Sequence, residues 1–130
     1  MLKVSLSRST PADVGEFIRK NFVDGMRNGD NLCLDAESTT PDFGSYAVEG
    51  TFNPDIFFDH ERMNEEANFM TFVRDDENHG IGGINPGHGY ARAAAFTMSI
   101  RTGHETEDDV KAVIEKIPLF GSQFHHVIFE

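Results

Sequence analysis

The chain has 130 residues, of which 22 are acidic and 11 are lysine or arginine, so its net charge is −11. This length predicts one domain, residues 1–130, built around a single core. The charge argues against direct binding of nucleic acid or of an anionic membrane, because both need clustered lysine and arginine. No stretch is apolar enough to span a bilayer and the first residues do not resemble a secretory signal, so we expect a cytoplasmic protein.

A strand followed by a capped helix is predicted at the N-terminus. Apolar and polar side chains alternate over residues 2–7, which is the period of a strand with one buried face. Thr10, Pro11 and Asp13 then form a helix start, with Thr10 as the N-cap and proline at the first helical position. The helix is expected to end near Gly25. Its buried stripe would consist of Val14, Phe17, Ile18 and Phe22.

The middle of the chain and its C-terminus contain further candidate elements. Strands are predicted over Asn31–Asp35, 45–52, 68–74 and 124–129, where β-branched and aromatic residues gather. A short helix is predicted over 53–67, because Asn53 and Pro54 suit a helix start.

The N-terminal strand and helix are repeated 96 residues later without gaps. Phe96, Met98 and Ile100 alternate as a strand, Thr106 is the expected N-cap, and Pro118 stops the helix. The matching pairs are Val4 with Ile100, Thr10 with Thr106, Asp13 with Asp109, Val14 with Val110, Ile18 with Ile114, and Lys20 with Lys116. A duplication and the common pattern of capped helices after strands both explain this match.

The order of these elements predicts an α+β fold. It corresponds to a ferredoxin-like split βαβ sandwich with an extra strand or hairpin, in which two helices pack on a mostly antiparallel sheet. Such folds carry many unrelated functions, so function has to be argued from particular residues.

The negative charge is concentrated in the middle third. Thirteen acids and only two arginines lie in residues 30–77, whereas the rest of the chain is balanced. A field of one sign attracts a basic partner, so we expect a small interaction protein of the inhibitor, immunity or antagonist type. Solubility alone is the alternative reason for the charge. The expected partner-binding residues are Asp55, Asp59, Glu61, Glu65, Glu66, Asp75, Asp76 and Glu77.

A glycine- and histidine-rich segment over residues 79–89 suggests a second function. Glycines let backbone N–H groups approach an anion, and flanking arginines could pair with a phosphate or carboxylate. This hypothesis predicts a protein that binds an anionic small molecule or nucleotide and that can form a homo-oligomer. The alternative is a long hairpin loop without a ligand. The expected ligand-binding residues are Arg74, His79, Gly80, Gly82, Gly83, Asn85, His88, Arg92 and Arg101.

Catalysis and metal binding have no sequence support. The six histidines form no HxH, HxxxH or HExxH pattern, and the single cysteine, Cys33, excludes a cysteine-based zinc site. Nucleophile motifs such as GxSxG are also missing. We therefore expect no catalytic residue, no cofactor and no metal, and a scaffold subunit without a ligand is a third possible function.

Overall fold

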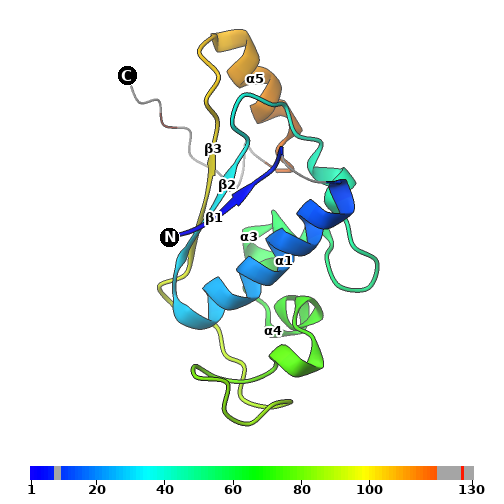
Figure 1. Cartoon of the computed structure of the whole chain (residues 1–130), viewed down its shortest axis with the longest axis vertical. Coiled ribbons are helices and arrows are strands. Elements are labelled where there is room, and N and C mark those ends of the chain that lie inside the picture. The colour runs from blue at the N-terminus through cyan, green and yellow to red at the C-terminus, as the bar shows by residue number, and fades with distance from the viewer. Residues whose placement is uncertain (8–9, 120–126, 128–130) are drawn as a thin grey trace.

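Three parallel strands form the sheet of this protein, as its computed structural model shows (Figure 1). The strands are β1 (Leu2–Ser5), β2 (Asn31–Asp35) and β3 (Thr97–Arg101), in the order β1-β2-β3. Helix α1 (Pro11–Asn28) connects the first two strands, and α5 (Glu107–Lys116) follows the third. The structure describes residues 1–7, 10–119 and 127.

The direction of the strands corrects the predicted fold. In each pairing the strands run parallel, with Val4 opposite Leu34 and Leu34 opposite Ile100. The predicted ferredoxin-like sandwich with a mostly antiparallel sheet is therefore wrong, although the α+β character is confirmed. The reason is physical: alternation of apolar residues identifies a half-buried strand but is the same for both directions. Direction depends on the connections, and both connections here are long enough to return the chain to the starting edge.

Helix α1 covers the apolar face of the sheet (Figure 1). Val14, Ile18 and Phe22 are buried against this face, as predicted, whereas Phe17 is 52% exposed. Phe22 lies at the centre of an aromatic cluster and makes edge-to-face contacts with Phe57 and Phe72. This geometry is favourable because the positive edge of one ring meets the negative face of another.

The connection from β2 to β3, residues 36–96, contains short helical turns rather than strands, and after residue 77 it contains neither. The predicted strand over 68–74 is wrong, because Phe69 and Phe72 are three residues apart and bury the same side of a helical turn. The predicted strand over 45–52 is also wrong, apart from one bridge between Val48 and Phe52. The turns are η1 (Phe43–Tyr46), α2 (Pro54–Phe57), α3 (His60–Met63), α4 (Glu66–Phe69), η2 (Met70–Phe72) and η3 (Asp75–Glu77). The predicted helix over 53–67 is thus divided between α2, α3 and the start of α4.

The two helix starts confirm the repeated strand-helix unit. Thr10 caps α1 and Thr106 caps α5, and each threonine hydroxyl oxygen accepts from the backbone N–H three residues later. The predicted end of α1 at Gly25 is wrong, because the helix continues to Asn28 and ends at Gly29 with φ +77°. Gly25 serves packing instead, since a methyl group there would lie 3.2 Å from the ring of Phe96.

Two expectations have a limited outcome. The predicted strand over 124–129 lies outside the described residues, apart from Val127. Among the helices of the described residues, none is both long enough and apolar enough to cross a membrane.

The closest approach of α1 to its neighbours gives a test of the fold. A methyl group at Gly15 would overlap the carbonyl oxygen of Tyr46 in η1. We expect Gly15→Ala to lower the free energy of unfolding by about 3 kcal/mol, since η1 would have to move away from the core. Gly44→Ala in η1 is the control, because its nearest atom lies 3.6 Å away. Urea denaturation of both variants measures the difference, and equal stabilities would contradict the packing of α1 on η1.

Candidate functional site

Five predicted partner-binding acids lie on the consecutive short helices α2, α3 and α4. Asp55 is in the first turn of α2, Asp59 caps α3, and the others follow within α3 and at the start of α4. Four of them are exposed and Asp59 is half-buried. No ion pair joins any of them to another described residue. We call α2–α4 with these five acids the acidic helices: Asp55, Asp59, Glu61, Glu65 and Glu66.

The acids face outward because the opposite side of each turn is anchored in the core. Phe57 at the end of α2, Met63 at the end of α3 and Phe69 at the end of α4 are all buried. One-turn helices of this kind have little stability of their own, so these buried apolar side chains fix their orientation. The acidic helices are therefore held on a buried apolar base, which reduces the entropy that a partner would have to remove.

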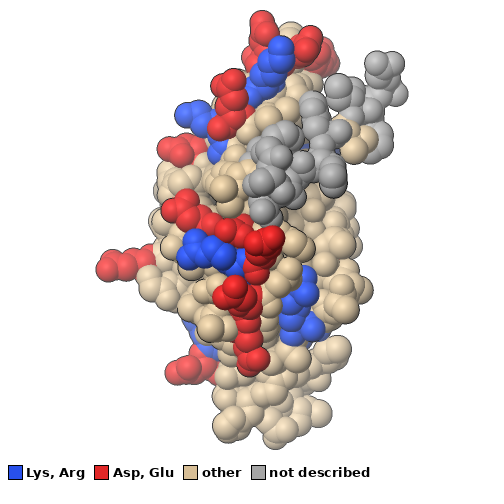
Figure 2. Space-filling model, turned by 180° about the vertical axis from the view of Figure 1, so that it is seen from behind, with Lys and Arg blue, Asp and Glu red and all other residues tan. Residues whose placement is uncertain are grey.

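Charges of both signs appear on one face of the molecule. Figure 2 shows acidic side chains running down the middle of this face, with basic side chains beside them. On this face, the lower end shows neither kind. That end is formed by the glycine-rich segment, which lies at the bottom of Figure 1.

Glu77 differs from the other predicted acids because it contacts a buried arginine. Arg19 on α1 is completely buried, and its two terminal nitrogens lie 2.7 and 2.9 Å from the carboxylate oxygens of Glu77. Arg19 also donates to the carbonyl oxygen of Phe72 at 2.7 Å. Asp75 and Asp76, in the same turn, are exposed and form no ion pair with a described residue. The carboxylate of Glu77 thus fastens the last helical turn of the long connection, η3, to α1.

A second carboxylate completes this ionic network. Glu16 receives two hydrogen bonds from Arg19 and also lies 2.9 Å from Arg74. The hydrogen bond from Arg19 lowers the pKa of Glu16 below its ordinary value. Burial raises the pKa of Glu77, but the hydrogen bonds from Arg19 and from the backbone of Arg74 outweigh it, so that pKa is lowered too. Arg74, a predicted ligand-binding residue, is therefore held by Glu16.

The glycine-rich segment is fixed to α1 at its base. Arg27 donates to the carbonyl oxygens of Glu77 at 2.6 Å and His79 at 3.0 Å, and its guanidinium lies 5.3 Å from the ring centre of Tyr90. The hydroxyl of Tyr90 donates to the carbonyl of Val23 on α1 at 2.8 Å. Burial raises the pKa of Tyr90, so this hydroxyl keeps its proton at neutral pH.

Beyond this base the chain forms a projecting loop, residues 80–89, that we call the glycine loop. Four of its glycines have φ between +71° and +87°, and Asn85 has φ +62°. Such values favour glycine, which explains the composition of the loop. Asn78 closes it, because its side chain donates to the carbonyl of Gly87 and accepts from the N–H of Tyr90.

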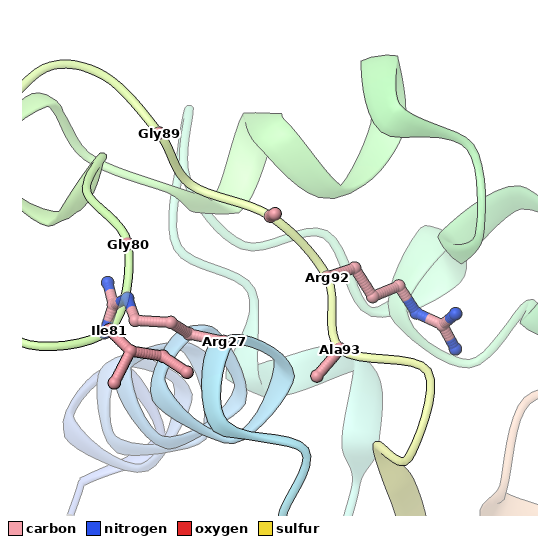
Figure 3. A pocket seen from close by; sticks show the side chains of 7 residues that line it. Arg27, Gly80, Ile81, Gly89, Arg92 and Ala93 are labelled. Atoms are coloured by element: carbon pink, nitrogen blue, oxygen red, sulfur yellow. The ribbon is translucent and has the colours of Figure 1, made fainter.

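A hollow of about 270 Å³ lies between the glycine loop and α1 (Figure 3). The side chain of Arg92 points away from Arg27 and Gly80. His79, whose ring contacts the carbonyl of Gly80, lies at the start of the loop. The structure thus brings His79, the loop residues and the backbone of Arg92 close together. The hollow is lined by Arg27, Gly80, Ile81, Gly89, Ala91, Arg92 and Ala93.

Arg101 lies at the carboxyl end of β3 and contacts Asp35, not the glycine loop. The buried carboxylate of Asp35 accepts from Arg101 at 3.0 Å and lies 2.7 Å from the ammonium group of Lys3. Burial raises the pKa of Asp35, but Lys3 and the backbone N–H of Glu37 lower it further, so it stays below its ordinary value. One carboxylate therefore links all three strands. Among the described residues, no three His, Cys, Asp or Glu side chains gather into a group that could hold a metal ion.

Sequence reasoning did not identify the residues that hold these surfaces in place. Arg19 and Arg27 lie on α1 among apolar residues, and nothing in their spacing reveals partners fifty or more positions away. One signal was available: an arginine on the buried side of an amphipathic helix needs a carboxylate partner. The partner itself could not have been chosen from thirteen nearby acids.

Acid is expected to weaken the network around Arg19. Because the pKa values of Glu16 and Glu77 are below the ordinary 4.5, their ion pairs stabilise the fold above this pH and are lost as the pH falls below it. Glu77→Gln should lower the free energy of unfolding by about 3 kcal/mol at neutral pH and by much less near pH 3. Urea denaturation at both pH values measures this, with Asp76→Asn as the control. The same loss at both pH values would show that Glu77 is not acting as an anion.

Comparison with known proteins identified no relative of this chain. No protein family, no curated protein and no solved structure was found to match the chain. Its function is therefore inferred from its own residues, of which the acidic helices and the glycine loop are the most distinctive.

Proposed function

We propose that this protein is a small cytoplasmic interaction protein that binds a basic surface of another protein through the acidic helices. The observation that carries the proposal is the contrast among its acids. Glu16, Asp35 and Glu77 are held by arginine or lysine inside the molecule, whereas the acidic helices form no ion pair with a described residue. A carboxylate that forms no ion pair with a described lysine or arginine can pair with a lysine or arginine of a partner protein.

The position of these acids supports binding by attraction over distance. Five carboxylates within α2–α4 have only Arg62 among them as a basic neighbour in the sequence. Such a field speeds the encounter with a basic partner, since the attraction acts over about 10 Å at 0.1 M salt. Inhibitor, immunity and antagonist proteins are the functional classes that fit a charge-guided contact of this kind.

Small-molecule binding at the glycine loop has less support. The arginines that we expected to bind an anionic ligand do not meet at one place. Arg74 contacts Glu16 and Arg101 contacts Asp35. Arg27 lines the hollow but already donates to Asp24 and to two backbone carbonyls.

The cytoplasmic location in this proposal fits Cys33, which is buried in β2 and is the only cysteine of the chain.

A pair of variants with the same net charge tests the proposal. The first neutralises Asp55, Glu61, Glu65 and Glu66 to the corresponding amides and leaves Asp59, the cap of α3, intact. The second neutralises four exposed acids in and before α5: Glu105, Glu107, Asp108 and Glu115. Each removes four negative charges from a different place. The second variant also removes the exposed ion pair between Glu107 and Lys111, which contributes little to stability.

The expected result is a loss of binding in the first variant alone. Immobilised protein should capture a basic protein at low salt and release it at high salt, and surface plasmon resonance then gives the rate constants for that partner. Neutralising the acidic helices should slow association at least about tenfold at low salt. Equal losses in both variants would show that only net charge matters. Binding that is unchanged by the first variant would contradict the proposal.

A further inference from the structure

The glycine loop presents two large apolar side chains to solvent. Ile81 is 74% exposed and Ile84 is 70% exposed, and no Asp, Glu, Lys or Arg occurs in residues 79–91. On the face that Figure 2 draws, this end of the molecule shows no charged side chain. Water contact at two neighbouring isoleucines is unfavourable, so this tip gains free energy when another surface covers it.

The loop that carries these side chains is fixed at its base. Arg27 and Tyr90 attach that base to α1, and Asn78 bridges its two sides. Within the loop, the backbone N–H of Gly83 donates to the carbonyl of Gly80, and that of His88 donates to the carbonyl of Asn85. Such contacts restrict the unbound loop, which lowers the conformational entropy that it loses when it binds.

The same end of the molecule contains a place for such a side chain. The hollow beside the loop has a volume of about 270 Å³ (Figure 3). Most of its lining is apolar or glycine, and Arg27 and Arg92 also border it: Gly80, Ile81, Gly89, Ala91 and Ala93 form the rest. An apolar cavity of about 150 Å³ already accommodates benzene, so this hollow has room for an isoleucine side chain. A projecting apolar residue and an apolar hollow on one patch make that patch self-complementary. This is the requirement of a two-fold symmetric contact, in which each copy gives and receives the same group.

We propose that two copies of this chain form a two-fold symmetric dimer through their glycine loops, with Ile84 of each copy seated in the hollow of the other. Charge favours this end for self-association. Two molecules of net charge −11 repel each other, and the uncharged segment 79–91 is where they can approach with the least repulsion. The dimer contact does not use the acidic helices, so it does not depend on the function proposed above.

Sedimentation equilibrium over a range of protein concentrations up to about 1 mM tests the dimer. We expect a concentration-dependent dimer that becomes tighter as salt rises, because salt screens the repulsion between the two negative molecules. Ile84→Ser should weaken dimerisation at least about tenfold without changing the thermal midpoint of the dilute monomer, since the side chain is exposed. Phe17→Ser removes an exposed apolar side chain of α1 and is the control that should leave the dimer intact.

A crosslinking experiment identifies the contact itself. Ile84→Cys and Ala91→Cys are made separately and mixed under mild oxidation, while buried Cys33 stays unreactive. Disulfide-linked dimers should form between unlike variants in preference to like ones. A monomer at every concentration, a dimer unaffected by Ile84→Ser, or crosslinks without preference would each overturn the proposal. The salt response separates it from the acidic helices, whose contact with a basic partner weakens as salt rises.

Discussion

The buried guanidinium of Arg19 is the interaction on which the arrangement of this protein depends. A charged group without solvent is tolerated only when every donor has a partner, and Arg19 achieves this with two carboxylates and a backbone carbonyl. The partners come from α1 itself and from the last helical turns of the connection between β2 and β3, at Phe72 and Glu77. The network thus decides where that connection returns to the helix, at a point where apolar packing alone would permit several arrangements.

Both candidate surfaces follow from this attachment. Upstream of Glu77, the turns α2 to α4 are pressed against the aromatic cluster around Phe22, and their acids remain outside. Downstream, Arg27 and Tyr90 continue the attachment about two turns farther along α1 and direct the glycine loop away from the body of the protein. The two surfaces are different in kind, since one carries concentrated charge and the other carries none. A protein can therefore use them for different contacts at the same time.

Local features of the fold were predictable from the sequence, and long-range ones were not. Thr10 and Thr106 identify the starts of their helices in the sequence, because an N-cap side chain binds a backbone N–H only three residues away. Asn31–Asp35 is confirmed as a strand for a similar reason, since its apolar residues lie side by side in the sequence. Strand direction, by contrast, depends on connections whose course the pattern does not contain. The error over 68–74 has the same origin, because an aromatic-rich run has no preference between a strand and a buried helical turn until its neighbours are known.

The candidate site shows the same division. The acids of α2–α4 and the glycine loop are visible as composition, so both could be located before the structure was known. The arginines that support them could not, because Arg19 and Arg27 bind partners fifty or more residues away. The sequence also offered Arg74 and Arg101 as neighbours of one ligand, and the structure assigns each to a different carboxylate. Which cation meets which anion is a property of the folded chain.

The pairing of β2 with β3 has a consequence for how the chain folds. Asp35 and Arg101 are 66 residues apart in sequence, so the third strand can join the sheet only after a large loop has closed. β1, α1 and β2 are adjacent in the sequence and emerge first from a ribosome, whereas β3 emerges only after the whole aromatic connection. Contacts of such long range slow folding. During synthesis, one edge of β2 therefore stays unpaired until β3 has been made. The connection that delays β3 also supplies aromatic rings that cover the core.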